Sequence, residues 1–313
     1  MALSPATTTL TPTWAASPRV PARVATVRAQ FDARAERFAD HDALVREVGA
    51  RLLDRLQYIR LDPQRVLDIG CGAGAAFAAL AARYPAAFTV GVDLSEAMLR
   101  QRTTRLRERL PRWLGGGAPG RAAADAGRLP IADDAIDLVL SNLMLHWHPE
   151  PHGLFPEWKR VLRVGGLLLF SCFGPDTLKE LRSACRSALP QARPMPFIDM
   201  HDFGDMMVAS GFANPVMDAE VITLTYPSAA SLLREARALG GNPRDDRSPG
   251  LPSGRQARSL LDAIGLRAQG DGSIALTFEV AYGHAWKPEP TAQGASIGVD
   301  ALRAELARRR RPS

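Results

Sequence analysis

The stretch Arg65–Gly74 constrains the fold of this chain more than any other. A short apolar run ends in Asp68, and Gly70, Gly72 and Gly74 then alternate with small residues before an Ala-rich helical sequence. This order predicts a strand, a tight turn and the N-terminus of a helix, which together form the ligand-facing corner of an open α/β sheet. Glycine suits such a corner because it permits backbone angles and close ligand approaches that a Cβ atom would forbid. We therefore expect a doubly wound α/β sheet.

The glycines alone do not identify the ligand, because the same turn satisfies the G-x-G-x-x-G/A pattern of dinucleotide-binding proteins. Asp68 brings an acid into the turn, where it would repel a pyrophosphate and attract an ammonium or sulfonium group. A ligand carboxylate would still be favoured at the helix N-terminus. S-adenosylmethionine carries all three groups. A nicotinamide dinucleotide would instead place its pyrophosphate beside Asp68.

Further acids follow the turn in a fixed order. Residues 88–93 form a second expected strand that ends in Asp93, about twenty residues beyond the turn, where a ribose diol would be held. Asp125 precedes Leu129-Pro130 and is placed to accept the adenine amino group, and residues 135–142 form the strand across the topological switch point. Each acid alone is also typical of a helix cap or a turn.

As an ordered set, these segments resemble the class I S-adenosylmethionine-dependent methyltransferases over residues 62–172. The resemblance implies a Rossmann-like sheet and S-adenosylmethionine as cofactor. It also implies a set of cofactor-binding residues, which comprises Asp68, Gly70, Gly72, Gly74, Asp93, Leu94, Asp125, Ala126 and Asn142.

The composition predicts one globular domain with an elaboration. Of the 313 residues, 46% are hydrophobic and 23% charged, and no apolar run is long enough to span a bilayer. Residues 1–27 lack acids and are rich in Ala, Thr, Pro and Ser, so we expect a disordered tail, with a transit peptide as the second interpretation. Residues 288–313 are expected to be a disordered basic tail. The methyltransferase domain at 28–287 is then expected to comprise an N-terminal lid at 28–60, a core at 62–172 and a cap or insertion at about 174–265.

The cysteine content and the net charge indicate which compartment and which kinds of partner to expect. The three cysteines form no C-x-x-C pair and are odd in number, which favours a reducing cytoplasm and argues against a zinc or disulfide framework. The net charge of +6 suits an acidic partner. A basic nucleic-acid-binding module would leave the ordered acids unexplained. We therefore expect a cytoplasmic monomer without a metal, a nucleic-acid partner or a membrane partner.

A second resemblance is more specific and extends over about residues 28–287. The segments that carry it are Phe31–Arg34, Ser141–Trp147, Phe173–Arg182, Asp199–Asp202, Thr223–Tyr226 and Tyr282–Lys287. They are similar to segments of the malonyl-acyl-carrier protein O-methyltransferases of biotin synthesis. This resemblance implies methyl transfer from S-adenosylmethionine to the free carboxylate of malonyl-acyl carrier protein or malonyl-coenzyme A. The ester masks the charge, so that fatty-acid synthesis can elongate the unit toward pimeloyl.

The implied reaction needs no general base, because a malonyl carboxylate is already ionised at neutral pH. The enzyme has to align the reacting atoms and strip water from the carboxylate, and aromatic walls suit that task. We expect Phe38 and Phe173 to be these walls, although relatives often have Tyr where this chain has Phe38. His146 is expected to be either a polar positioning residue or a structural histidine.

Basic residues are candidates for contact with a carrier protein. A helix is expected from Ser95 to about Leu110, and Arg102 and Arg105 lie along one side of it. Such a stripe is typical of a solvated face, and it would also dock an acidic carrier. Arg182 is the other candidate. Pairing with the carrier is the better role for it, because tight pairing with the substrate carboxylate would blunt that nucleophile.

Other enzyme classes share part of this pattern. One is a small-molecule methyltransferase of the quinone-pathway type, which usually lacks the long C-terminal elaboration. Another is the branch related to mitochondrial complex I assembly, whose activity resembles that of hydroxylases. A nicotinamide dehydrogenase is disfavoured by Asp68.

Overall fold

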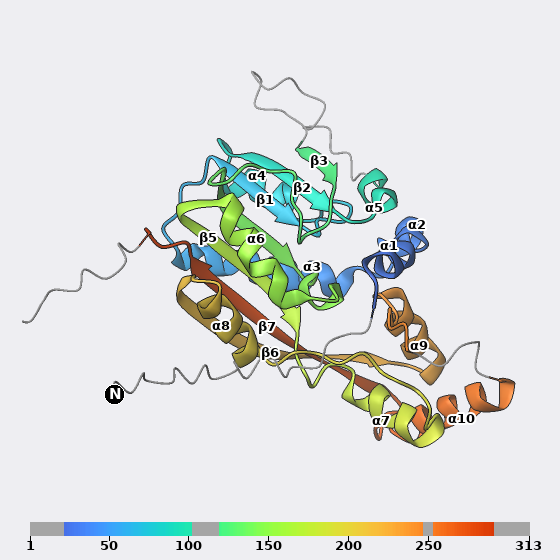
Figure 1. The fold of residues 1–313 in the computed structure, drawn as a ribbon. Helices are drawn as coiled ribbons and strands as arrows, with labels where there is room; N and C mark the ends of the chain where they lie inside the picture. Colours follow the sequence, from blue (N-terminus) through green and yellow to red (C-terminus); the bar gives the residue numbers. More distant parts are fainter. Residues whose placement is uncertain (1–21, 102–118, 247–252, 291–313) are drawn as a thin grey trace, which may run out of the picture.

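The computed structural model describes residues 22–101, 119–246 and 253–290. Its centre is a seven-stranded sheet in the order β3-β2-β1-β4-β5-β7-β6 (Figure 1). The strands are β1 (Arg65–Ile69), β2 (Phe88–Asp93), β3 (Gly120–Ala123), β4 (Ile136–Asn142), β5 (Leu162–Phe173), β6 (Ala213–Tyr226) and β7 (Ile274–Trp286). Strands β1 to β5 are parallel, whereas β7 runs antiparallel to both β5 and β6. The doubly wound α/β fold expected from the sequence is confirmed.

Helices cover both faces of this sheet. The α-helices are α1 (Val24–Asp32), α2 (Ala35–Phe38), α3 (Ala43–Asp54), α4 (Phe77–Arg83), α5 (Glu96–Arg100), α6 (Leu154–Val161), α7 (Lys179–Ala188), α8 (Met200–Ala209), α9 (Ala229–Ala238) and α10 (Gly254–Gly265). Short 3-10 helices are η2 (Arg55–Tyr58), η5 (Leu145–Trp147) and η6 (Pro151–Gly153). Within residues 22–101, 119–246 and 253–290, no helix has the length and apolar character needed to cross a bilayer.

The two faces of the sheet carry separate parts of the core. Side chains alternate between the faces along a strand, so Leu67 of β1 packs with α6 and α8, whereas Val66 packs with α3. On the α6 side, Phe155 meets Trp158 and Phe170 edge to face, with ring centroids 5.7 Å apart in both pairs. On the other side, α3 and η2 bury a row of apolar residues with a four-residue spacing, which places them on one helical face. These residues are Leu44, Val48, Leu52 and Leu56.

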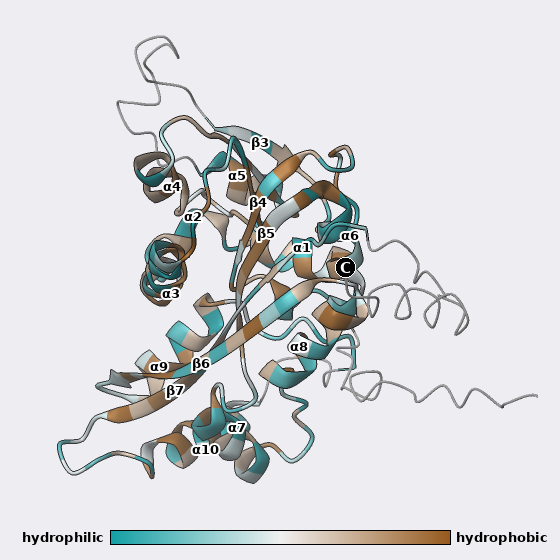
Figure 2. Cartoon of the chain, turned by 90° about the vertical axis from the view of Figure 1, so that its left-hand side faces the viewer, coloured by the Kyte–Doolittle hydropathy of each residue, from teal (hydrophilic) through white to brown (hydrophobic). Residues whose placement is uncertain are grey.

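The last two strands extend beyond the rest of the sheet. Strand β6 has 14 residues and β7 has 13, and Tyr226 pairs with Ile274 across a connection that contains α9 and α10. Figures 1 and 2 show α7, α9 and α10 at the far end of this pair. Figure 2 also shows hydrophobic stretches along β4, β5 and β7, where these helices and α3 bury them. The helical insertion expected near the last strands is therefore present.

One expected helix begins later than the sequence indicated, and another extends beyond the described residues. The Ala-rich helix expected after the glycine turn begins only at Phe77, because Gly74 has φ +90° and its N–H donates to the Cys71 carbonyl (2.8 Å) in a turn. The helix expected from Ser95 to about Leu110 begins at Ser95 as its N-cap and continues over Glu96–Arg100, and its expected part from Arg102 lies outside the described residues.

Candidate active site

A cavity lies where the carboxyl ends of β1, β2 and β4 meet the N-terminal helices. This is the topological switch point of the sheet, where open α/β proteins bind ligands. Val24, Val27 and Phe31 line the cavity from α1, and Phe38 lines it from the end of α2. Their spacing places the apolar side of α1 toward the cavity. The helices expected as an N-terminal lid therefore cover the predicted cofactor corner.

The glycine turn forms one wall of this cavity. The N–H groups of Gly70 and Cys71 both donate to the Val92 carbonyl, at 2.8 and 3.1 Å, so the end of β1 is tied to the end of β2. Gly70, Gly72 and Gly74 all have positive φ angles. A Cβ atom on Gly70 would also overlap the side chain of Met144. The turn thus needs glycine both for its backbone angles and for its packing.

Asp68 is a buried acid at the edge of this turn. It is 3% exposed and lines the cavity. Burial raises its pKa to about 7, and the nearby Asp93 carboxylate adds to the shift while Arg121 opposes it. A buried carboxylate with this balance of neighbours is stabilised in its charged form by a cation. The position therefore fits the positively charged end of S-adenosylmethionine.

Asp93 joins the glycine turn to the start of α5. Its Oδ2 accepts the Gly72 N–H and its Oδ1 accepts the Ser95 N–H, each at 2.8 Å. Burial raises its pKa despite these two hydrogen bonds. Each carboxylate oxygen can accept more than one hydrogen, so both remain able to hold a ribose hydroxyl. Asp93 and the following Leu94 line the cavity as the sequence predicted.

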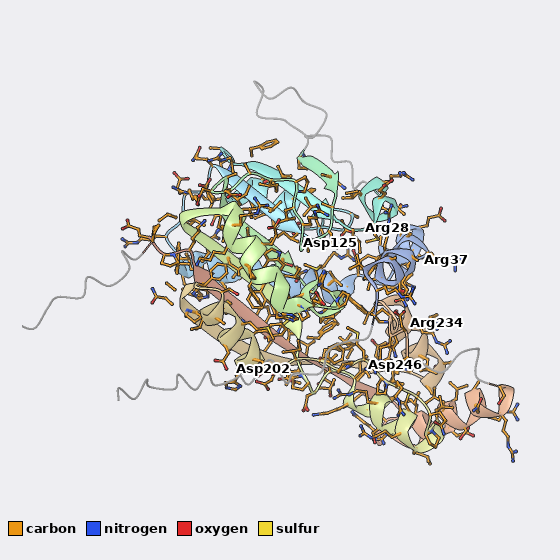
Figure 3. All side chains as sticks on the ribbon, viewed as in Figure 1. Arg28, Arg37, Asp125, Asp202, Arg234 and Asp246 are labelled. Carbon is orange, nitrogen blue, oxygen red and sulfur yellow. The ribbon has the colours of Figure 1, made fainter. Side chains whose placement is uncertain are left out.

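Asp125 lies just beyond the end of β3, toward α1 (Figure 3). Its Oδ1 accepts the Gly127 N–H at 2.8 Å and lies 3.3 Å from His148 Nε2. Because the Glu150 N–H donates to His148 Nδ1, the hydrogen of a neutral His148 is on Nε2 and points to Asp125. The hydrogen bond from His148 is the main cause that lowers the pKa of Asp125.

Ala126 follows Asp125 and also lines the cavity. Its carbonyl accepts the Trp158 indole N–H at 3.0 Å, which fixes the backbone of this segment. A fixed backbone beside an ionised carboxylate is compatible with the adenine contact predicted for Asp125 and with the cofactor contact predicted for Ala126.

Asn142 lines the cavity, but its amide group also makes two hydrogen bonds within the protein. Its Nδ2 donates to the Val45 carbonyl at 2.9 Å, and its Oδ1 accepts the Ser171 hydroxyl at 2.8 Å. Gly49 allows this contact, since a Cβ atom there would lie 3.0 Å from Asn142 Nδ2. Asn142 therefore attaches α3 to the ends of β4 and β5, in addition to facing the cavity.

Aromatic rings form the remaining wall. Phe38 and Phe173, the two predicted walls, both line the cavity. Phe31 and Trp147 join them, with their ring centroids 5.4 Å apart in an edge-to-face contact. The sequence reasoning missed both as site residues. For Trp147, the signal was its place just after the carboxyl end of β4.

Hydrogen bonds hold the lid over the cavity from two sides. Asp32 at the end of α1 accepts the Ser95 hydroxyl at 2.5 Å, next to the first turn of α5. On the other side, Gln30 donates to the Asn242 carbonyl at 3.1 Å. His41 Nδ1 also lies 3.0 Å from Glu235 of α9. The lid helices thus bridge the core of the sheet and the insertion.

His146 lies behind the aromatic wall and does not line the cavity. It is 5% exposed, and its ring centroid is 4.6 Å from that of Phe173. The Phe173 N–H donates to its Nδ1 at 3.4 Å, so the hydrogen of the neutral ring is on the buried Nε2, which has no partner among the described residues. Burial lowers the pKa of His146 to about 3. Of the two roles expected from the sequence, the geometry favours the structural one.

Of the candidates for carrier contact, only Arg182 is among the described residues, and it is not in the cavity. Arg182 lies on α7, donates to the Pro175 carbonyl and does not line the cavity, and burial lowers its pKa. Arg102 and Arg105 lie outside the described residues.

Comparisons with known proteins agree with this geometry. A family model described as a methyltransferase domain matches residues 67–170. The structure resembles a putative methyltransferase from Bacillus halodurans (TM-score 0.54, 18% identity), covering 76% of this chain and 99% of that one. It also resembles phosphoethanolamine N-methyltransferase 2 of Haemonchus contortus, solved with S-adenosylhomocysteine (TM-score 0.52, 20% identity), covering 84% of this chain and 60% of that one. At these identities the likeness concerns the fold.

Curated relatives are much closer in sequence. A malonyl-acyl-carrier protein O-methyltransferase of Laribacter hongkongensis is 44% identical over 264 residues, which cover 84% of this chain and 89% of the relative. One of a Methylovorus species is 41% identical over 268 residues, which cover 85% of this chain and 89% of the relative. The chain therefore belongs to the family of malonyl-acyl-carrier protein O-methyltransferases, which are S-adenosylmethionine-dependent enzymes.

Proposed function

We propose that this protein transfers the methyl group of S-adenosylmethionine to the free carboxylate of malonyl-acyl carrier protein. The observation that carries the proposal is the combination, in one lidded cavity, of the buried acid Asp68 with the aromatic wall of Phe38 and Phe173. Family membership selects a malonyl thioester over the quinone-type and hydroxylase-like interpretations. The resulting methyl ester would then enter biotin synthesis.

The residues present suit the cofactor along the length of the cavity. Asp68 and the glycine turn would hold the charged amino-acid end, Asp93 the ribose, and Asp125 with Ala126 the adenine. Leu94 and Asn142 flank this path. When bound, S-adenosylmethionine supplies an electrophilic methyl group on a positively charged sulfur.

The protein's own contribution is positioning and exclusion of water. A malonyl carboxylate has already lost its proton at neutral pH, so no side chain has to remove one. Water bound to the carboxylate weakens it as a nucleophile, and a closed apolar wall displaces that water. Phe38 and Phe173 provide this wall, while the lid contacts of Asp32 and Gln30 keep it closed.

We assign His146 a structural role, in which it supports Phe173 from behind the cavity wall. Its Nδ1 accepts the Phe173 N–H, and its neutral ring packs on the phenyl group that faces the cavity. A protonated imidazole at this place would lose the hydrogen-bond acceptor. The low pKa of His146 therefore keeps the wall in place across the physiological pH range.

We also propose a division of the chain into functional parts. Residues 28–287 act as the catalytic domain, with the core at 62–172, the lid at 28–60 and the cap at about 174–265. The contacts of α1 and of His41 with the α9 segment support a lid and a cap that work together. We further propose a cytoplasmic monomer.

The test is methyl transfer with a defined acceptor. The purified chain is incubated with labelled S-adenosylmethionine and malonyl-acyl carrier protein, and with malonyl-coenzyme A in parallel. A base-labile label on the carrier supports the proposal. A chain that binds S-adenosylmethionine but leaves both malonyl thioesters unlabelled would reject it. Complementation of a strain that requires biotin because it lacks this step then separates the pathway from that of a quinone-modifying enzyme.

A further inference from the structure

The ends of two helices meet at the cavity. Phe38 is the last residue of α2, Leu239 directly follows α9, and both line the cavity. The His41–Glu235 contact of 3.0 Å joins the turn after α2 to α9. Arg34, directly before α2, also packs against Gly241, where a Cβ atom would lie 2.5 Å from its guanidinium. The outer surfaces of α2 and α9 therefore form one region beside the reaction cavity.

Three exposed arginines lie on this region. Arg37 precedes Phe38 on α2, and Arg234 and Arg237 are three residues apart on one side of α9. Figure 3 shows Arg37 and Arg234 on the same side of the molecule. No described carboxylate lies within 4.0 Å of any of the three, whereas Arg28, Arg46, Arg51 and Arg160 all have ion-pair partners.

The acids nearby do not neutralise the exposed side of α9. Glu235 is the only acid of α9, and His41 already contacts it. Glu36 and Asp40 lie on the α2 side of the region, next to Arg37 in the sequence. The exposed residues of α9 between Ala229 and Ala238 are Ala230, Arg234 and Arg237, so this helix presents positive charge to the solvent.

We propose that Arg37, Arg234 and Arg237 form the docking surface for the acidic carrier protein that presents the malonyl thioester. This inference rests on the proposed function. The carboxylate has to reach the aromatic wall while the folded carrier stays outside, joined to it by a flexible prosthetic arm. A basic surface next to Phe38 and Leu239 places the base of that arm beside the cavity. Arginine also binds carboxylates and phosphates with paired hydrogen bonds, which suits both an acidic helix and the phosphate of the arm.

A second group of exposed arginines serves as a comparison. Arg186 of α7 and Arg255 and Arg258 of α10 are also without a described ion-pair partner. They lie on α7 and α10, and no residue of these two helices lines the cavity, whereas Leu239 directly after α9 does. A carrier bound there would present its thioester away from the reaction site.

The experiment measures carrier binding independently of methyl transfer. Affinity for holo-acyl carrier protein without a malonyl group is determined by surface plasmon resonance, at low and at high salt, on the full chain. We expect the triple variant R37E/R234E/R237E to bind at least about ten-fold more weakly at low salt, with a reduced salt dependence. The matched variant R186E/R255E/R258E changes the net charge equally and is expected to stay within about two-fold of the wild type. Circular dichroism and S-adenosylmethionine titration check both variants for folding.

The outcomes separate docking from function. Wild-type affinity in the R37E/R234E/R237E variant, an equal loss in the matched variant, or no carrier binding by the wild type would each overturn the docking surface. A wild type that binds the carrier through these arginines, yet methylates no malonyl carrier, would leave the docking surface in place and refute the proposed function instead.

Discussion

Replacing Asp68 by Asn is expected to abolish the pH dependence of cofactor binding. In the free protein, burial and the Asp93 charge raise the pKa of Asp68 from 3.8 to about 7. A cation bound beside Asp68 favours its charged form and lowers that pKa again, so binding at acidic pH must release a proton. S-adenosylmethionine should therefore bind more tightly as the pH rises toward 7.

The size of this effect follows from the pKa shift. If the pKa falls well below 5.5 in the complex, the affinity at about pH 7 exceeds that at about pH 5.5 by about 15-fold, or about 1.6 kcal/mol. About half a proton is released per cofactor bound near pH 7, and nearly one near pH 5.5. The same shift makes the stability of the free protein depend on pH. A carboxyl with a raised pKa stabilises the native state below pH 3.8, and this contribution is lost as the pH rises through about 7. Near neutral pH the buried charge of Asp68 therefore opposes folding.

Isothermal titration calorimetry in buffers of different ionisation enthalpy measures both the affinity and the released protons. The D68N variant should bind more weakly and with an affinity that is flat over this pH range. The D93N variant is the matched control, since it removes the charge that raises the pKa of Asp68 and should shift the midpoint to lower pH without flattening the curve. A wild-type affinity that does not change with pH, or an unchanged slope in D68N, would refute the reasoning.

Three further substitutions test other parts of the site. Asp93→Ala removes the acceptor of two backbone N–H groups and the proposed acceptor of the ribose, so calorimetry should show at least about ten-fold weaker cofactor binding; unchanged affinity would remove Asp93 from this role. Phe38→Ala opens the aromatic wall and should lower kcat at least about ten-fold in the methyl-transfer assay, with S-adenosylhomocysteine affinity retained; an unaltered kcat would contradict a wall at this position. His146 has a pKa lowered from 6.5 to about 3, so its neutral form supports folding above pH 6.5 and that support is lost as the pH falls from 6.5 to 3. At pH 5 the free energy of unfolding has fallen by about 2 kcal/mol through this group, and denaturant unfolding of H146Q should not show that decrease. The same pH dependence in the wild type and in H146Q would show that His146 is not the source of the decrease.

Much of the site was predictable because it follows local rules. Three glycines between a strand and a helical sequence indicate a tight turn with backbone angles that other residues avoid, and all three have positive φ angles. Asp93 ends β2, which pairs with β1, and Asp125 follows β3, which pairs with β2, and parallel strands end at the same edge of a sheet. Their meeting at one cavity is therefore a consequence of strand order.

The rest of the site depends on contacts between distant segments. Trp147 reaches the cavity because Gly240, far along the chain, leaves room for its indole, and the sequence gives no sign of that pairing. His146 and Trp147 are adjacent in a 3-10 helix that turns one ring toward the core and the other toward the cavity. The hydrogen bond between Asp32 and Ser95 likewise joins the end of α1 to the N-cap of α5. An acid at a helix end and a serine at an N-cap are both common, so neither residue indicates this contact in the sequence.

The central claim is that the malonyl carboxylate is the methyl acceptor. Mass spectrometry of malonyl-acyl carrier protein after incubation with the enzyme and S-adenosylmethionine tests it most directly, with the malonyl group replaced by an acetyl group as the control acceptor. We expect the malonyl carrier to gain one methyl group as an ester at the free carboxyl end, and the acetyl carrier to gain none. A methyl group on both carriers, or on neither while the enzyme binds S-adenosylmethionine, would contradict it.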